Sequence, residues 1–275
     1  MKHMMIAAML LAGGTAYAQD VEWTQTVDVP KGANLPSGVT VDILGIAPGD
    51  SYEEAKAKLE AIIAQPNDYY SEPRIQEYQY EIFLPLPGGQ RVTVRYVGAM
   101  KVEITRMGTK PSESIHVGLS APSSGHQVVA VERHISYSAQ AEQPRISAVL
   151  ESLTGRMGSV HRTDAFGSGV HHIHRFDDGR ALGADTPWPS WGCDPVQAHG
   201  NVAEADLYRI NNDGTCDVVF KTEFGFGLSD DHARSIWFKL GDNARARENF
   251  TADYQFFRDY VDALQNSAGA EAPKL

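Results

Sequence analysis

The chain has 275 residues, of which 42% are hydrophobic, enough for one or two globular domains with real cores. Its 24 Lys and Arg residues stand against 35 Asp and Glu residues, which gives a net charge of -11. This acidic balance argues against a protein that binds by neutralising phosphates, whether on nucleic acid or on an anionic membrane. We therefore expect no nucleic-acid partner.

The first 18 residues contain the three parts of a secretory signal peptide in the expected order. Lys2 provides the positive charge, residues 4–12 form a short apolar stretch, and Ala16–Ala18 is an A-x-A cleavage site. The alternative for this segment is a buried N-terminal helix. No stretch of the chain approaches the about 18 apolar residues of a transmembrane helix. We predict that residues 1–18 are removed, that the protein is periplasmic or secreted, and that it has no membrane span.

The chain has two cysteines, Cys193 and Cys216, and both follow the predicted cleavage site. An oxidising compartment favours a disulfide over two free thiols. A catalytic or metal-binding cysteine is the alternative, but neither a C-x-x-C pair nor a zinc-type spacing is present. The sequence therefore predicts a Cys193–Cys216 disulfide.

Three segments have the periodicity of amphipathic helices. Ser51–Glu54 has the form of a capping box, and the apolar stripe that follows it continues until Pro66. A second helix is expected with Pro144 as its first residue and with Gly155 as its C-terminal stop. Apolar residues at helical spacing over 250–264 predict a third helix near the C-terminus.

Most other apolar residues alternate with period two, which is typical of half-buried strands. Segments 78–84 and 92–96, with a turn at 85–89 between them, predict an antiparallel hairpin. Further strands are expected at 101–105, 127–137, 170–176, 208–210, 215–224 and 235–240. Asn211–Gly214 predicts a hairpin turn because Asp-Gly tolerates positive φ angles.

A strand, loop and helix occur at residues 39–63 and again at 128–155, and antiparallel strands follow each of them. We therefore predict an α+β fold of two modules, each a helix packed on an antiparallel β-sheet, plus a C-terminal helix. The expected bounds are 19–125 for the first module, 126–266 for the second module with the disulfide, and 267–275 for a flexible tail.

The entry to the first helix is Gly45-Ile46-Ala47-Pro48-Gly49-Asp50-Ser51. It resembles the glycine-spaced entry of small envelope modules of the BamE and β-lactamase-inhibitor type. The resemblance covers these seven residues and supplies no binding residues for this chain. It implies an analogy of fold only, so it assigns no family and no function.

Familiar hydrolase motifs are missing from the sequence: there is no G-x-S-x-G, S-x-x-K or H-E-x-x-H motif and no Walker-type glycine loop.

The strongest chemical pattern is His171-His172-Ile173-His174. On a strand, His172 and His174 share one face, from which two imidazoles can bind one metal ion, and His171 faces the other way. A zinc site needs a further ligand; the candidates are His161, Asp164, Asp177 and His199. The alternative is an edge strand with solvated histidines.

Trp188 and Trp191 lie just before Cys193. Two tryptophans in four residues can stack on a sugar ring or anchor a partner protein. The alternative is that they cover the disulfide, since an exported loop of this length needs apolar cover. Trp188 and Trp191 are therefore candidate ligand-binding residues.

These patterns lead to two functional hypotheses. The first is an exported, soluble, non-catalytic binding or interaction protein that recognises a small ligand or an envelope protein. The second is a divalent-metal (zinc) binding protein or metal-dependent hydrolase centred on His172 and His174, in which a metal-bound water is the nucleophile. No cofactor is certain, and zinc is the candidate.

Overall fold

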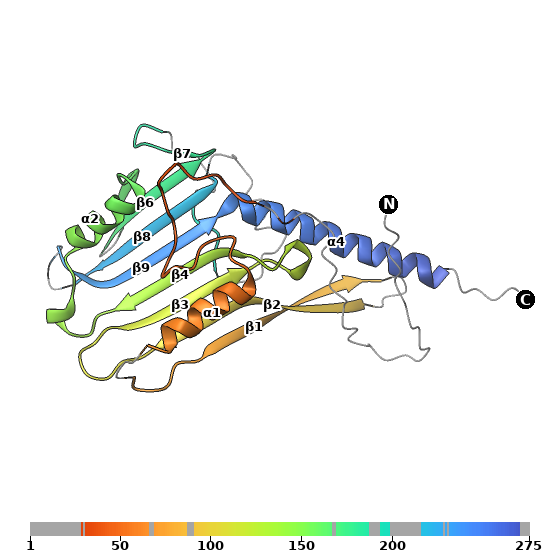
Figure 1. The fold of residues 1–275 in the computed structure, drawn as a ribbon, viewed down its shortest axis with the longest axis horizontal. Helices are drawn as coiled ribbons and strands as arrows, with labels where there is room; N and C mark the ends of the chain where they lie inside the picture. Colours follow the sequence, from red (N-terminus) through yellow and green to blue (C-terminus); the bar gives the residue numbers. More distant parts are fainter. Residues whose placement is uncertain are drawn as a thin grey trace, which may run out of the picture.

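A computed structural model describes residues 29, 31–65, 69–86, 91–166, 169–186, 193–198, 216–227, 229 and 231–269 of the chain. Its strands form one antiparallel sheet of nine strands, in the order β1-β2-β3-β4-β9-β8-β6-β5, with β7 also paired to β6 (Figure 1). The strands are β1 (Ile75–Pro85), β2 (Arg91–Ile104), β3 (Ser112–Leu119), β4 (Val128–Ser136), β5 (Arg162–Phe166), β6 (Gly169–Asp177), β7 (Arg180–Ala181), β8 (Val218–Phe226) and β9 (Ala233–Asp242). The predicted hairpin is β1 with the first half of β2.

Two helices, α1 (Tyr52–Ile63) and α2 (Ile146–Met157), lie on the same side of the sheet, which we call the front face (Figure 1). α1 begins at the predicted capping box: the Ser51 hydroxyl accepts from the Glu54 amide, and the Glu54 carboxylate accepts from the Ser51 amide. The largest core cluster lies beneath both helices and includes Leu59, Val117, Val131, Leu153 and Leu240.

α2 begins at Ile146, shortly after the predicted first residue Pro144, and it does not end at Gly155. It continues to Met157, and its C-terminal cap is Gly158, whose φ of 83° suits a glycine. Met157 is buried against the front-face core. Burial of the Met157 side chain stabilises the last residues of the helix. Gly155 is therefore an internal helix residue.

α4 (Asn243–Gly269) packs against the opposite side of the sheet, the back face. Phe250 packs with Val129, and Phe256 and Phe257 pack with Val94 of β2. The helix starts before the predicted stripe, directly after β9, and it also includes residues 267–269 of the segment predicted as a tail. No helix among the described residues is long and apolar enough to cross a membrane.

The prediction of two helix-on-sheet modules is wrong, because the sheet is continuous between the two halves of the chain. β3 pairs with β4 from Ser112↔Ser136 to Leu119↔Val128, and β4 pairs with β9 along its other edge. The sequence pattern predicts no strand at β3 or at β5. The repeat of strand, loop and helix at 39–63 and 128–155, from which two modules were predicted, does not divide the sheet, because β3 connects the first hairpin to β4.

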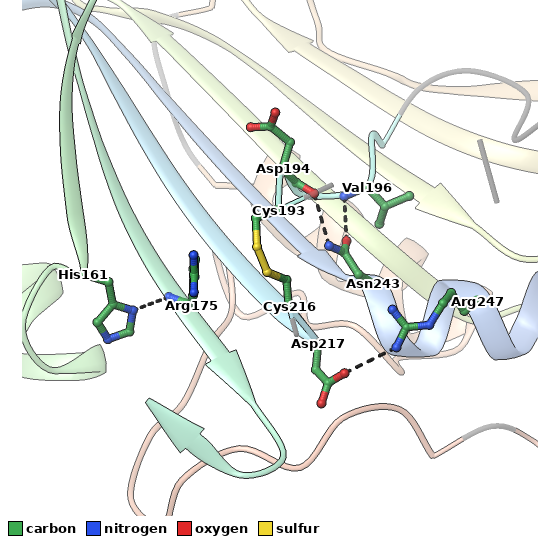
Figure 2. The surroundings of a disulfide bond; sticks show 9 residues. All are labelled: His161, Arg175, Cys193, Asp194, Val196, Cys216, Asp217, Asn243 and Arg247. Carbon is green, nitrogen blue, oxygen red and sulfur yellow. Dashed lines mark hydrogen bonds and ion pairs between the residues drawn. A yellow bond between two sulfur atoms is a disulfide. The ribbon is translucent and has the colours of Figure 1, made fainter. Parts of the chain in front are cut away.

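The predicted disulfide is present and joins Cys193 to Cys216, just before β8 (Figure 2). Both cysteines pack with Ile173 and Val219.

The segment after Cys193 lies close against the sheet at Gly118. A Cβ added to Gly118 would lie 2.9 Å from the Ala198 backbone, so only glycine leaves room for this contact. Asn243, at the start of α4, accepts from the Val196 amide and donates to the Asp194 carbonyl (Figure 2). The disulfide segment is therefore held between the sheet and α4.

Asp253 attaches α4 to η2 (Pro122–Ser124), the short turn between β3 and β4. Its carboxylate accepts from the Ala121 amide at 3.0 Å and from the Ser123 hydroxyl at 2.6 Å. Burial raises the pKa of Asp253 to about 6, although these hydrogen bonds act to lower it. The folded protein therefore binds this proton more tightly than the unfolded chain does.

The raised pKa of Asp253 predicts a pH-dependent stability. Its contribution is fully present below about pH 4 and is lost as the pH rises through about 6. Asp253→Asn stays neutral at every pH, so the free energy of unfolding of the wild type should fall relative to this variant by roughly 1–3 kcal/mol between pH 4 and pH 7. Urea unfolding at intervals across this range measures the difference. Asp259→Asn, on an exposed part of the same helix, is the control, and an Asp253→Asn curve parallel to the wild type would contradict the prediction.

Candidate functional site

The predicted alternation of the histidines on β6 is present. His172 and His174 lie on the front face, where the His172 ring contacts Phe224 and the His174 ring contacts Phe220. His171 lies on the back face, with its Nε2 3.8 Å from the Glu223 carboxylate.

His174 is fully buried beside His161, with 5.9 Å between their ring centroids. Burial lowers the pKa of each imidazole to about 4, assisted at His161 by the charge of Arg175 and at His174 by His161. His161 Nδ1 accepts from the Arg175 amide. Neither ring nitrogen of His174 has a hydrogen-bond partner of normal geometry among the described residues, although the nearby Ser159 backbone partly offsets the fall in pKa. Both imidazoles are therefore neutral at pH 7.

The described residues contain no group of three or more His, Cys, Asp or Glu side chains able to hold a metal ion. Asp164 lies on the back face and pairs with Arg162. Asp177, at the end of β6, has its pKa raised by burial and by Asp217. His199, Trp188 and Trp191 lie outside the described residues, so the structure does not place the predicted Trp site. The arrangement of the described candidate ligands does not favour the zinc hypothesis.

A cavity lies on the front face, between α2 and the turn at residues 42–44 that precedes α1. Its volume is about 500 Å³. Phe220 of β8, Phe238 of β9 and Arg133 of β4 form its floor. Its walls consist of Asp42, Ile43, Leu44, Ala148, Val149, Ser152, Leu153 and Arg156. We call this cavity the α2 cleft; its floor is mostly aromatic and its rim carries charges.

The charged side chains of the α2 cleft are paired with neighbours. Arg156 Nη2 donates to the Asp42 carboxylate at 2.6 Å across the rim. Arg133 donates through Nε and Nη2 to one oxygen of Glu113, at 2.7 and 2.6 Å. Arg106 binds the other oxygen of Glu113 at 2.5 Å. Burial alone would raise the pKa of Glu113, but the two guanidinium groups lower it, so this carboxylate is charged at neutral pH.

Leu44 occupies a strained position at the edge of the α2 cleft. Ile43 and Ile46 exchange two backbone hydrogen bonds of 3.0 Å, and the residues between them, Leu44 and Gly45, have φ angles of 56° and 79°. A two-residue turn of this kind needs positive φ at both positions and strongly prefers Asn-Gly or Asp-Gly. A leucine there is an outlier that costs about 1–3 kcal/mol. Its side chain is 38% exposed, so burial does not explain its presence.

None of the residues that line the α2 cleft is a site residue predicted from the sequence; Val149 and Leu153 are predicted only as part of the apolar stripe of a helix. The lining of the cleft comes from three strands, one helix and one turn that are far apart in the chain. The one local feature that could have indicated it is the Leu44-Gly45 pair between Ile43 and Ile46, because a bulky residue is unusual before glycine in a tight turn.

The strain at Leu44 leads to opposite predictions for adjacent residues. Leu44→Asn should raise the free energy of unfolding by about 1 kcal/mol, because asparagine tolerates positive φ. Gly45→Ala should lower it by about 1 kcal/mol, since no atom lies within 4 Å of an added Cβ and the cost is that of the backbone alone. Urea unfolding of both variants measures the change in the free energy of unfolding. A lower free energy of unfolding for Leu44→Asn would contradict the prediction, because it would show that the leucine side chain stabilises the fold.

Comparison of the chain with protein-family models gives no match, and neither a curated protein nor a solved structure matches it. The α2 cleft and its lining are therefore the basis on which a function can be proposed.

Proposed function

We propose that the protein is an exported binding protein that holds a small, largely apolar molecule in the α2 cleft. The observation that carries this proposal is the cleft itself. Its volume of about 500 Å³ falls within the range of about 300–1,000 Å³ typical of small-molecule sites. Seven of its eleven lining residues are apolar, and the four polar ones stand among them as groups that can orient a ligand.

The chemistry of the lining favours binding over catalysis. Ser152 supplies the hydroxyl and Asp42 the carboxylate among the lining residues, and no histidine lines the cleft. Asp42 is held by Arg156, so it is not poised to activate a nucleophile. The strained Leu44 at the rim supports a ligand site, because backbone strain tends to persist where function requires it.

Export is part of this proposal. The Cys193–Cys216 disulfide supports an oxidising compartment, and the N-terminal pattern of residues 1–18 supports secretion. After expression in a bacterium with the native N-terminus, the protein recovered from the periplasm should have the mass of a chain that begins at Gln19. Intact-mass spectrometry measures this, and periplasmic protein that still begins at Met1 would contradict the predicted cleavage.

Filling the α2 cleft should abolish binding. A neutral apolar fluorophore, N-phenyl-1-naphthylamine, should bind the wild-type protein with a blue shift and a gain in emission, and Ser152→Trp should reduce its affinity at least tenfold by occupying the cleft. Ser147→Trp is a matched control, since Ser147 is an exposed residue of α2 that does not line the cleft. Fluorescence titration with both variants measures the effect. Absence of fluorophore binding to the wild type, or equal loss in both variants, would refute the proposed function.

A further inference from the structure

We infer that the ligand of the α2 cleft is an anionic amphiphile whose head group binds Arg133. This inference rests on the proposed function and adds the chemical class of the ligand. Its basis is the balance of charge around the floor of the cleft and the position of that charge beside the aromatic rings.

Positive charge is in excess at the floor of the cleft. Arg133 and Arg106 share a single carboxylate, that of Glu113, whose side chain is 5% exposed. The rim pair of Arg156 and Asp42 is balanced by itself. Three guanidinium groups are thus matched by two carboxylates. A partly buried cation without a full counter-charge is unfavourable, and an anion bound there would remove the imbalance.

Arg133 is the guanidinium placed to receive this anion. Its side chain is 25% exposed and lines the cleft, whereas Arg106 does not line it. Nε and Nη2 of Arg133 bind Glu113, and none of the described hydrogen bonds uses Nη1. Glu113 fixes the plane of the guanidinium, so a ligand does not have to order a mobile side chain. A charge-assisted hydrogen bond from Nη1 to an anionic head group is the contact that this geometry offers.

The apolar part of the ligand would lie directly beside its head group. Arg133 and Phe238 are register partners on β4 and β9, so their side chains are neighbours on the front face. Phe220 continues the aromatic floor on β8, and Leu153 of α2 lines the facing wall. A molecule with a negative charge at one end and an apolar body fits this arrangement, with its charge at Arg133 and its body against the aromatic rings. A cation would meet the excess positive charge, and a neutral chain would leave it unbalanced.

Displacement of N-phenyl-1-naphthylamine by molecules with one tail and different heads tests the inference. Dodecanoate and dodecyl phosphate should displace the fluorophore from the wild-type protein at concentrations at least tenfold lower than dodecanol, all below their micelle thresholds. Dodecyltrimethylammonium should compete most weakly. The ratio of dodecanoate to dodecyl phosphate distinguishes a carboxylate head from a phosphate head.

Variants of Arg133 locate the head group. Arg133→Gln should bring dodecanoate to the affinity that dodecanol has for the same variant, because the preference for an anionic head depends on the guanidinium charge. Glu113 keeps Arg106 as its partner in this variant. Arg133→Lys should retain part of the preference. Arg145→Gln removes one exposed positive charge outside the cleft and should have no effect.

Each outcome decides between the two proposals. Equal displacement by all heads on the wild-type protein would overturn the inference and leave the apolar binding function intact. Retention of the dodecanoate preference in Arg133→Gln would also overturn it, because the head group would then lie elsewhere. If Arg133→Gln does not fold, the head-group series on the wild type and on Arg133→Lys still decides the matter. Failure of the fluorophore to bind the wild type would instead refute the function itself.

Discussion

Strand β4 is hydrogen-bonded along both edges, to β3 just before it and to β9 far later in the chain. This double pairing joins the two halves of the protein into one sheet with a shared core. Because α1 and α2 both lie on the front face, the turn before α1 and the side of α2 come to face each other across it (Figure 1). The α2 cleft lies where α2 and the turn before α1, which come from different halves of the chain, leave the sheet uncovered between them.

Two features of the cleft do not follow from stability alone. Leu44 holds a backbone conformation that suits asparagine or glycine, and Arg133 lies at the floor among apolar rings, held by a buried carboxylate that it shares with Arg106. Replacing a buried ion pair by apolar residues often leaves stability unchanged or improves it. The strain at Leu44 and the partly buried charge of Arg133 at one place are the observations that support the proposed binding function.

The histidines on β6 follow the strand alternation that the sequence predicts, and metal binding by them stays a prediction. Strand alternation does put His172 and His174 on one face, as predicted, and both imidazoles have a lowered pKa because they are buried. Aromatic rings of β8 occupy the space beside them: Phe224 is next to His172 and Phe220 next to His174. His161 lies beside His174, but the described residues contain no group of three His, Cys, Asp or Glu side chains that could hold a metal ion.

The sequence by itself determined the local structure wherever the cause is local: the Ser51–Glu54 capping box, the hairpin of β1 and β2, the alternation on β6, and the pairing of the two cysteines. It did not reveal β3, because a charged Glu113 occupies an inward position at the start of that strand and its partners, Arg106 and Arg133, are brought to it only by folding. Without β3, the single sheet was read as two modules. The α2 cleft was likewise decided by tertiary structure, since its floor and walls meet only when β4 pairs with β9 and both helices pack on one face.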